Sequence, residues 1–440
     1  MFFKSLLIAA ACAVGMQASA QGLVPLPPQP EGLAWPTENW PEGDVPDVIE
    51  EELSLLIRDA MATGVTEPMG QTRAIVIIHE GRLIFETYAD GFGPETKQVS
   101  WSMAKSITSA LVGRAVELGL IEDIDYVMPS PFPEGDPRGE ITWRQWLTMT
   151  DGLDYLEIGS TGLTDNDVVQ MMYGPGRFDV AQHIVDEFEL AHDPGAVWNY
   201  STAGFHIIGW ALSQNSLGKE QDYDIRVMVR RRTDDMPRPQ PIHPLPMKCY
   251  SLVRIDSDLT DAEREILWPK CMAFLRAKEW IFSPLGMDAQ PEFDAAGTFL
   301  GGSLVWASAR DFAKFGYLYL RDGVWEGERL LPEGWVDFSR RDPVSTKTNV
   351  YGAGWWLGAD PVPEPAGQAA TTPPFDAFSA QGHEGQTIWI VPSKDLVIVR
   401  LGLTPNDGDN WPRLYEWNQS VARLFPDVSD REVSAQEDEG

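Results

Sequence analysis

The spacing of apolar residues predicts two β-hairpins, one near each end of the chain. Extended runs rich in β-branched residues occupy positions 74–79 and 82–88, and Glu80-Gly81 between them is a typical turn sequence. Two similar runs, 387–391 and 396–401, are separated by a few turn-forming residues. Because the two runs of each pair are adjacent in the sequence, we expect them to form antiparallel strands.

Helical spacing of apolar residues predicts helices between and before these hairpins. Residues 47–64 carry an apolar face, and residues 107–118 repeat apolar side chains every three or four positions until a glycine follows. Residues 203–212 form another apolar helical run. Ser201 or Thr202 can cap the start of this last helix, because a hydroxyl oxygen accepts a hydrogen bond from a free backbone N–H.

The two ends of the chain have the composition of segments outside a folded core. Residues 1–20 contain a lysine, an apolar run and the small residues Ala-Ser-Ala, which predict a secretory signal peptide cleaved before Gln21. Residues 21–46 contain seven prolines and are expected to be extended. Residues 427–440 form an acidic tail that we expect to be disordered. The mature protein is thus predicted to be exported, and periplasmic where the host has an outer membrane.

The charge of the chain narrows the class of its partners. The sequence has 34 basic and 66 acidic side chains, a net charge of −32. Such a chain repels nucleic acid and anionic membranes, since phosphate binding depends on Lys and Arg. After the signal peptide, no apolar run approaches the roughly 18 residues that a membrane-spanning helix needs. We therefore expect a small-molecule substrate, with no nucleic-acid partner and no membrane span. The sequence leaves the oligomeric state open.

Ser102-Met-Ala-Lys105 is the first candidate for chemistry. Ser102 falls in the first turn of the predicted helix, and Lys105 follows three positions later on the same face, where Cβ atoms are about 5–6 Å apart. A serine hydroxyl becomes nucleophilic when a base takes its proton, and a buried lysine with a lowered pKa can be that base. The alternative is a capping serine beside a solvated lysine. A second match, Ser216 to Lys219, shows that the tetrapeptide alone is weak support.

Two further segments add to this candidate. Tyr200 precedes the helix 203–212, where the helix dipole and a nearby ammonium can stabilise a phenolate. The alternative is an ordinary core tyrosine. Residues 381–386, Gln-Gly-His-Glu-Gly-Gln, place two glycines just before the strand 387–391, and glycine there permits close approach of the backbone to a substrate. The alternative is a simple turn.

Together the three segments resemble the serine β-lactamase and penicillin-binding-protein superfamily, in its class C-like branch. The resemblance extends from about Asp47 to about Phe425. Ser102-Met-Ala-Lys105 fits the S-x-x-K box fully, whereas Tyr200-Ser-Thr202 fits the Y-x-N box only at its tyrosine. His383-Glu-Gly385 fits the third box, K-T-G, only at its glycine. The resemblance implies an α+β, β-lactamase-like fold, in which an antiparallel sheet flanked by helices and a mostly helical subdomain meet at the active-site cleft.

The resemblance also implies one β-lactamase-like domain over residues 47–426. Its α/β part is expected at about 47–120 and 285–426, and its helical part at about 121–284 with an insertion at about 219–277. The insertion contains Cys249 and Cys271, the two cysteines left after signal cleavage, and in an oxidising compartment they are expected to form a disulfide. The insertion is either a lid or oligomer contact, or a plain surface elaboration.

The departures from the family pattern narrow the predicted substrate. A cation in the third box would help to hold the carboxylate of a β-lactam, but here Glu384 follows His383 and disfavours a second carboxylate. Thr202 also replaces the asparagine of the second box. Both changes favour the branch that resembles esterases and 6-aminohexanoate-dimer (nylon oligomer) hydrolases, which act on esters and small linear amides.

The predicted mechanism is acyl transfer through a covalent intermediate. Ser102 is the expected nucleophile, with Lys105 and Tyr200 as general base and acid. The backbone N–H of Ser102 and, as the resemblance implies, that of Gln386 are expected to form the oxyanion hole, a part worth about 10²–10³ in rate for each donor. His383, Glu384 and Gly385 are expected to contact the substrate. No metal or organic cofactor is needed for this chemistry.

Two rival functions stay open. One is a β-lactamase or D-alanyl-D-alanine carboxypeptidase, and the other is a non-catalytic binding protein that keeps the fold. An α/β-hydrolase is excluded because the chain has no G-x-S-x-G elbow. A zinc enzyme is also disfavoured, since the six histidines are scattered and form no H-E-x-x-H motif.

Overall fold

The computed structural model describes residues 23–62, 64, 69–157, 166–214, 260, 271–343, 350–358, 376–406 and 409–429. The α-helices that lie wholly within the described ranges are α1 (Asp47–Met61), α2 (Ala104–Glu117), α3 (Trp143–Leu147), α4 (Asp167–Met172), α5 (Val180–Glu187), α6 (Thr202–Ser213), α10 (Ala309–Leu320), α11 (Trp335–Ser339) and α12 (Asn410–Arg423), and residues 271–277 are also helical. Short 3-10 turns are η1 (Trp101–Met103), η2 (Pro137–Glu140), η4 (Pro175–Phe178), η7 (His383–Gly385) and η8 (Pro392–Lys394), and η6 (Lys278–Phe282) is a π-helix.

The strands form a large sheet and two small ones. Their bounds are β1 (Gln71–His79), β2 (Arg82–Tyr88), β3 (Gln98–Val99), β4 (Gln290–Pro291), β5 (Val305–Ala307), β6 (Val324–Trp325), β7 (Glu328–Arg329), β8 (Trp356–Leu357), β9 (Phe378–Gly382), β10 (Gln386–Val391) and β11 (Leu396–Leu403). Within the described part of the chain, the large sheet has the order β2-β1-β11-β10-β9-β8, and every pairing in it is antiparallel. Both predicted hairpins are present, as β1–β2 and β10–β11.

The two hairpins join where β1 pairs with β11, in a register that sets Val76 opposite Val399. The sheet is therefore made from both ends of the folded chain. Each face of the sheet is covered by helices, so both faces of β1 are apolar. Val76 and Ile78 belong to the core on one side of the sheet, and Ile75 and Ile77 to the core on the other.

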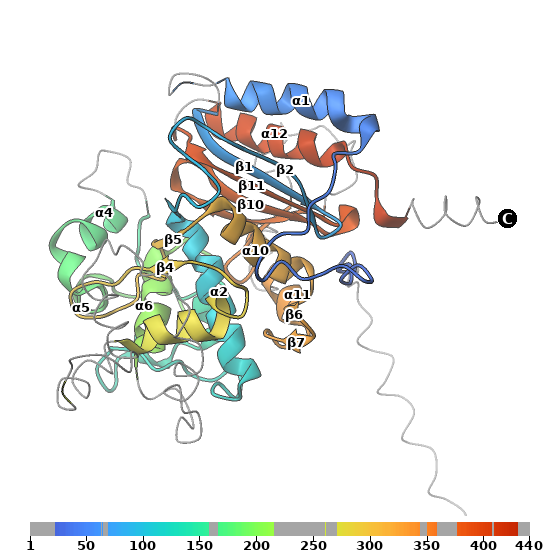
Figure 1. Ribbon diagram of the computed structural model, residues 1–440. Coiled ribbons are helices and arrows are strands. Elements are labelled where there is room, and N and C mark those ends of the chain that lie inside the picture. The colour runs from blue at the N-terminus through green and yellow to red at the C-terminus, as the bar shows by residue number, and fades with distance from the viewer. Residues whose placement is uncertain are drawn as a thin grey trace, which may run out of the picture.

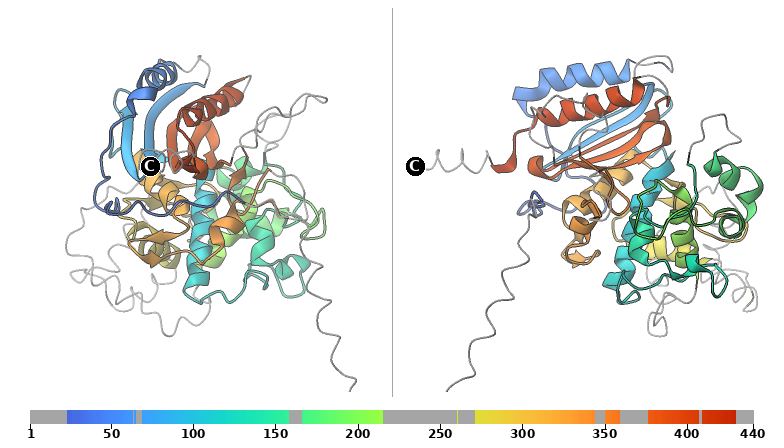
Figure 2. Two further views of the ribbon diagram at one scale, coloured as in Figure 1. Left: turned by 90° about the vertical axis from the view of Figure 1, so that its right-hand side faces the viewer. Right: turned by 180° about the vertical axis from the view of Figure 1, so that it is seen from behind.

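Helices cover the two faces of the large sheet unequally. Helices α1 and α12 lie side by side on one face, while α10 lies on the opposite face, between the sheet and the helical part of the molecule (Figures 1 and 2). A Cβ added to Gly316 of α10 would come within 2.7 Å of Ile388 Cγ2 and 2.9 Å of Val397 Cγ1. Glycine at this position thus allows α10 to lie directly on strands β10 and β11.

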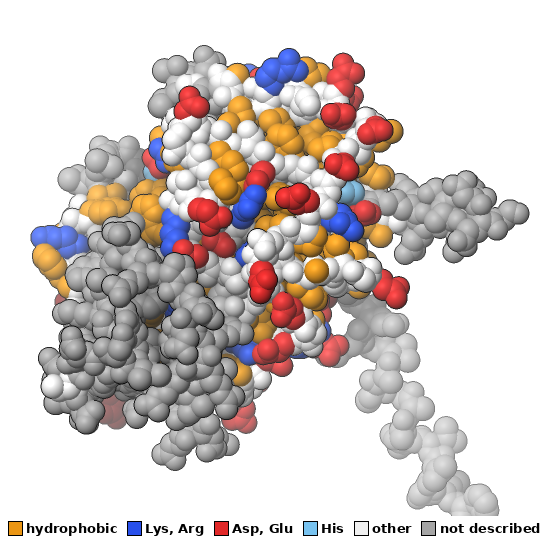
Figure 3. Space-filling view, viewed as in Figure 1, with side chains coloured by type: hydrophobic (Ala, Val, Ile, Leu, Met, Phe, Trp, Pro, Cys, Tyr) orange, Lys and Arg blue, Asp and Glu red, His pale blue; other side chains and the backbone are white. Residues whose placement is uncertain are grey.

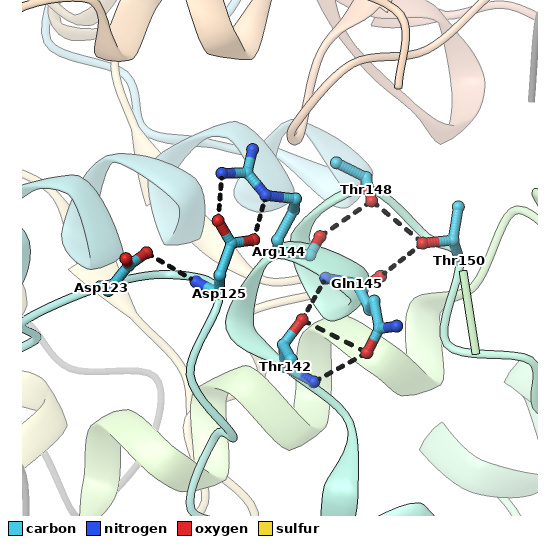
Figure 4. Close-up of polar contacts among 7 residues, drawn as sticks. All are labelled: Asp123, Asp125, Thr142, Arg144, Gln145, Thr148 and Thr150. Atoms are coloured by element: carbon cyan, nitrogen blue, oxygen red, sulfur yellow. Dashed lines mark hydrogen bonds and ion pairs between the residues drawn. The ribbon is translucent and has the colours of Figure 1, made fainter. Parts of the chain in front are cut away.

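The helical part is organised around α2 and α6, which contact each other and carry the residues of the candidate site. Helix α3 packs against α6 and begins with a capping box, in which the Thr142 and Gln145 side chains each bond the other's backbone N–H (Figure 4). Arg144 pairs with Asp125 beside it. A capped, anchored α3 fixes the start of the chain that leads on to residues 148–157.

The proline-rich segment that precedes α1 runs along the body of the protein, as expected. Trp40 is buried, and the ring of Trp35 lies 5.2 Å from that of Trp325. On the surface, acidic side chains are spread over the face drawn in Figure 3 with basic ones among them, which fits the net charge of −32. Among the described residues, no helix is both long enough and apolar enough to cross a membrane.

Several predictions concern residues outside the described ranges. These are the signal peptide at 1–20, the residues of the acidic tail after 429, and nearly all of the insertion at 219–277, including Cys249. Cys271 lies within the described ranges and is disulfide-bonded. The predicted α+β, β-lactamase-like fold is confirmed by the sheet and its helical layers.

Candidate active site

Ser102 and Lys105 meet at the junction of η1 and α2. Lys105 Nζ lies 3.0 Å from Ser102 Oγ, within hydrogen-bonding distance. The preceding residue, Trp101, has a φ of 45°, a left-handed conformation that is strained for a large side chain. Ser100 holds this segment in place, because its backbone N–H bonds Val305 O on β5 and its hydroxyl accepts from Val305 N.

The Lys105 side chain is completely buried and surrounded by oxygen atoms. Nζ also donates to Thr202 Oγ1 at 2.8 Å and to Gly302 O at 2.6 Å. Burial lowers the pKa of the Lys105 ammonium to about 8, against the opposing effect of the Glu157 carboxylate nearby. A lysine with this pKa has a neutral fraction near pH 7 and can accept a proton from the adjacent serine.

Tyr200 lies beside this pair, at the start of α6. Lys105 Nζ is 4.9 Å from the centroid of the tyrosine ring. Burial raises the pKa of the Tyr200 phenol, as does the Glu157 carboxylate, whereas a hydrogen bond with Ser102 lowers it. This upward direction, caused first by burial, is opposite to that of the stabilised phenolate considered from the sequence. Tyr200 carries its proton at neutral pH and can donate it.

Aromatic rings form one wall of the site. The Tyr200 ring stacks on Trp356 of β8, with centroids 5.2 Å apart and an interplanar angle of 20°. Tyr351 packs edge-on against both rings. Tyr200 was predicted as a site residue, but Tyr351 and Trp356 were not, because they come from a segment about 150 residues further along the chain.

The carbonyl of Gly302 is a third contact of Lys105 that the sequence analysis did not predict. The loop before β5 is wedged between helices, with Thr108 Oγ1 donating to Gly301 O and Gly302 N donating to His206 Nδ1. A Cβ on Gly302 would lie 2.8 Å from Thr202 O, so a larger residue would push this loop away. The adjacent glycines at 301 and 302 are the only local signal in the sequence for this close approach.

The turn between β9 and β10 approaches the nucleophile through Gly382. A Cβ on Gly382 would lie 2.1 Å from Ser100 O, so this backbone touches the segment that carries Ser102. A Cβ on Gly385 would instead meet Thr404 and Arg400, on the side of β11. Of the two glycines in the turn, Gly382 is thus the one in contact with the nucleophile segment.

The predicted site residues of this turn, three expected to contact the substrate and Gln386 expected in the oxyanion hole, divide into two groups. The His383 ring packs edge-on against Trp101 at 5.3 Å, and Glu384 Oε2 accepts from Trp101 Nε1 at 3.3 Å. Gln386, by contrast, turns its side chain toward β11 and exchanges two hydrogen bonds with the backbone of Gly402. The structure therefore brings His383 and Glu384 next to the residue before Ser102, while Gly385 and the Gln386 side chain contact β11 and its surroundings.

The strand β9 explains this division. The apolar pattern predicts the first strand of this hairpin at residues 387–391. The preceding strand, Phe378–Gly382, was not predicted. Because β9 is that strand and packs against η1, the last residue of β9 takes the position nearest the nucleophile. The missed signal was the apolar alternation of Phe378, Ala380 and Gly382 on one face.

Glu157 is a further residue of the site that the sequence analysis did not identify. Its carboxylate accepts the Thr202 N–H at 3.0 Å and the Thr202 hydroxyl at 2.7 Å. Thr202 thus connects Glu157 to Lys105. Within the described ranges, no group of three His, Cys, Asp or Glu side chains lies close enough together to hold a metal ion.

Comparison with known proteins agrees with this fold. A model of the beta-lactamase family matches residues 57–416. The 6-aminohexanoate-dimer hydrolase of Paenarthrobacter ureafaciens is 21% identical over 381 residues, which cover 81% of this chain and 78% of the relative.

Two solved structures have the same fold. A Bacillus anthracis protein assigned as a 6-aminohexanoate-dimer hydrolase has a TM-score of 0.55 and 19% identity, and the match covers 84% of this chain and 81% of that one. EstCE1, described as a hydrolase with promiscuous acyltransferase activity, has a TM-score of 0.54 and 17% identity, covering 85% and 98%.

The protein is a serine hydrolase with a β-lactamase-like fold. The chain belongs to the beta-lactamase family. Within that family it is similar in sequence to the 6-aminohexanoate-dimer hydrolase, and it shares its fold with EstCE1.

Proposed function

We propose that the protein cleaves an ester or a small linear amide through an acyl-enzyme on Ser102, with Lys105 and Tyr200 as general base and acid. The single observation that carries this proposal is the 3.0 Å contact between Ser102 Oγ and a buried lysine. A lysine without burial would stay protonated at neutral pH and could not act as the base.

The reaction follows from these positions. Neutral Lys105 takes the Ser102 proton as Oγ attacks the substrate carbonyl carbon, which gives a tetrahedral oxyanion. The phenol of Tyr200 donates its proton to the leaving oxygen or nitrogen as the bond to carbon breaks, and Lys105 then returns a proton to Tyr200. Water, deprotonated by the same pair, attacks the acyl-enzyme and releases the acid.

The geometry of the β9–β10 turn changes which residue we propose as the second oxyanion-hole donor. The Ser102 N–H remains the first proposed donor. For the second donor we favour the His383 N–H over that of Gln386, since His383 directly follows Gly382, which packs against Ser100 and Trp101. Removing one such donor costs about 10²–10³ in rate.

The chemistry beside the nucleophile favours esters and linear amides over β-lactams. Glu384 accepts a hydrogen bond from Trp101, so a carboxylate lies beside the residue that precedes Ser102 and disfavours a substrate carboxylate there. The stacked Tyr200 and Trp356 rings offer an apolar wall for an uncharged acyl or leaving group. The relationship to the 6-aminohexanoate-dimer hydrolase supports the same choice.

Other parts of the proposal concern the whole chain. We propose that residues 1–20 are a signal peptide, that the protein works outside the cytoplasm, and that Cys249 is the partner of disulfide-bonded Cys271. The single domain is proposed to span residues 47–426 with its insertion at about 219–277.

The experiment that tests the function is a substrate panel with a matched pair of serine variants. Wild type, Ser102→Ala and Ser216→Ala, the last at the second Ser-x-x-Lys match, are assayed with p-nitrophenyl esters, linear amides of aminohexanoate, D-amino-acid peptides and nitrocefin. Ser102→Ala should lose about 10⁴–10⁶ in kcat/KM while Ser216→Ala keeps wild-type activity. Mass spectrometry should find the acyl group on the peptide that contains Ser102.

The rival functions give different results in the same panel. Rapid nitrocefin turnover with inert esters and linear amides would assign a β-lactamase. Labelling by a fluorescent penicillin with D-peptide cleavage would assign a carboxypeptidase. Full ester hydrolysis by Ser102→Ala would disprove the nucleophile, and no turnover of any substrate would favour a non-catalytic binding protein.

A further inference from the structure

We propose that Glu157 is a positioning residue, which fixes the direction of the Thr202 hydroxyl and thereby leaves the lone pair of neutral Lys105 free for the Ser102 proton. This inference rests on the proposed function, since it concerns how Lys105 acts as a base. The relevant juxtaposition is a chain of three contacts, from the Glu157 carboxylate to Thr202, to Lys105 Nζ, to Ser102 Oγ.

The first step is the orientation of Thr202. Glu157 Oε2 accepts the Thr202 backbone N–H at 3.0 Å, and Oε1 accepts the Thr202 hydroxyl proton at 2.7 Å. A carboxylate has only acceptor oxygens, so the single proton of the hydroxyl must point toward Glu157. Toward Lys105, Thr202 Oγ1 can then only accept a hydrogen bond.

The second step concerns Lys105 Nζ, which makes three hydrogen bonds, to Gly302 O, Thr202 Oγ1 and Ser102 Oγ. Gly302 O, 2.6 Å away, is a carbonyl and can only accept. Thr202 Oγ1, 2.8 Å away, is restricted to accepting by Glu157. The ammonium form of Lys105 has three N–H groups, and it satisfies both of these acceptors and Ser102 Oγ.

The third step concerns the neutral amine, which is the form that acts as a base. It has two N–H groups and one lone pair, and the two acceptor-only neighbours use both N–H groups. The lone pair therefore faces the remaining neighbour, Ser102 Oγ, which can rotate its proton toward it. This is the arrangement that proton abstraction from Ser102 requires.

Without the carboxylate, the Thr202 hydroxyl could rotate and donate to Lys105. The lone pair of the amine would then be occupied by Thr202, and an N–H would face Ser102. In that arrangement Lys105 cannot take the serine proton, although every heavy atom is where it was. The role of Glu157 is thus one of hydrogen-bond direction in addition to its charge.

The pKa values of the titratable groups near Lys105 decide what the pH profile of kcat/KM reports. Burial and the Lys105 charge lower the pKa of His206 to about 3, so this histidine on α6 stays neutral. Burial and the Glu157 carboxylate raise the pKa values of Tyr155, Tyr200 and Tyr351. Of these described groups, Lys105 is the one whose pKa lies between 6 and 9.

The test is a double-mutant cycle of Glu157→Gln and Thr202→Ala, with kcat/KM measured across pH 5–10 on the best substrate of the panel above. Glutamine keeps the size of Glu157 but offers one acceptor oxygen instead of two. Glu117→Gln is the charge-matched control, because Glu117 is exposed at the far end of α2, about 18 Å along the helix from Lys105. Circular dichroism and thermal melting establish that each variant is folded.

Glu157→Gln should lower the high-pH plateau of kcat/KM about ten- to a hundredfold, as expected for a misplaced catalytic group. The acid limb should move to lower pH, because the carboxylate that raises the Lys105 pKa is gone. In the Thr202→Ala background, Glu157→Gln should change the plateau less than about twofold, since no hydroxyl remains to be oriented. Glu117→Gln should keep the wild-type profile.

Three results would overturn the inference. The first is an unchanged plateau in Glu157→Gln with only a shifted limb, which would reduce Glu157 to a charge effect. The second is an equal plateau loss with and without the Thr202 hydroxyl. The third is a similar loss in Glu117→Gln. If Ser102→Ala is active, both the proposed function and this inference are wrong. If Ser102→Ala is inactive but the effects of Glu157→Gln and Thr202→Ala on the plateau of kcat/KM are additive, only the inference is wrong.

Discussion

Lys105 and Arg400 are both fully buried cations, and they occupy the two sides of the candidate site. Lys105 lies beneath the nucleophile, bonded to one serine, one threonine and one carbonyl. Arg400 lies beneath the β9–β10 turn, where it bonds Gly385 O, Thr404 Oγ1 and other oxygens. Within the described residues, neither forms an ion pair with a carboxylate.

The difference between the two cations shows that burial alone does not make a catalytic group. Burial lowers the pKa of both side chains, that of Lys105 to about 8. A guanidinium starts from a pKa above 12 and keeps its proton in proteins, so Arg400 can only donate hydrogen bonds. Lys105 can lose its proton near neutral pH and has a serine 3.0 Å away. Arg400 supports the turn, and Lys105 can exchange a proton.

The strongest test of this comparison is Lys105→Met, which keeps the length of the side chain and removes the amine. We expect kcat/KM to fall by about 10²–10⁴, the range for loss of a general base. The fold should persist in circular dichroism. A variant that keeps more than about a tenth of the wild-type kcat/KM would show that Lys105 and Arg400 have the same, purely structural role.

Arg400→Met tests the other side. We expect a loss of about 3–5 kcal/mol in the free energy of unfolding, because the Gly385 carbonyl and the Thr404 hydroxyl oxygen lose the Arg400 donor, and the Met69 carbonyl keeps only the hydrogen bond from Thr404. Urea denaturation measures this loss. Arg400→Lys is the matched control and should recover part of it. If Arg400→Met folds with wild-type stability, the support of the turn must come from elsewhere.

Asp151 extends the comparison to a buried acid. Burial raises its pKa to about 7, and Oδ2 has no hydrogen-bond partner among the described residues. Since the folded pKa is raised, the charged form destabilises the fold, and this penalty grows as the pH rises from about 4 to 7. Relative to wild type, Asp151→Asn should gain about 2–3 kcal/mol between pH 5 and pH 8, as measured by denaturation at both pH values. A pH-independent difference would contradict the shift.

The last test is the pH dependence of wild-type activity. Because neutral Lys105 is the active form, kcat/KM should rise about tenfold per pH unit below pH 8 and level off above it. Asp151→Asn distinguishes the titration of Lys105 from that of Asp151, since removing the carboxyl group should leave the acid limb of kcat/KM unchanged. A limb near pH 7 that disappears in Asp151→Asn would assign the titration to the carboxyl group.

Much of the local structure could be predicted from the sequence. The hairpins, the helix after Ser102 and the capped helix after Tyr200 depend on spacing and turn residues that lie within about 20 positions of each other. Ser201 caps α6 as predicted, with its hydroxyl accepting from Gly204 N. The resemblance of Ser102-Met-Ala-Lys105 to a family box then supplied the order of the remaining segments.

The unpredicted parts of the site are contacts between distant segments. Neither Gly302 nor Glu157 was predicted as a site residue, because nothing in their sequence neighbourhoods marks them as partners of Lys105. The strand β9 is short and was not predicted. The resemblance placed the glycine of the third box at Gly385, whereas the glycine whose backbone contacts the Ser102 segment is Gly382. A short strand such as β9 forms only through its hydrogen bonds to the neighbouring strands β8 and β10, and the local sequence does not show these pairings.

The sequence by itself determined that a serine and a lysine share one face at a helix start, since that spacing is a property of any α-helix. Only the tertiary structure decided the chemistry of that lysine. Its pKa depends on complete burial, and the direction of its hydrogen bonds depends on Thr202, Gly302 and Glu157, which come from three other segments. Burial and hydrogen-bond direction arise when distant segments pack together, so neither is encoded in any one stretch of the chain.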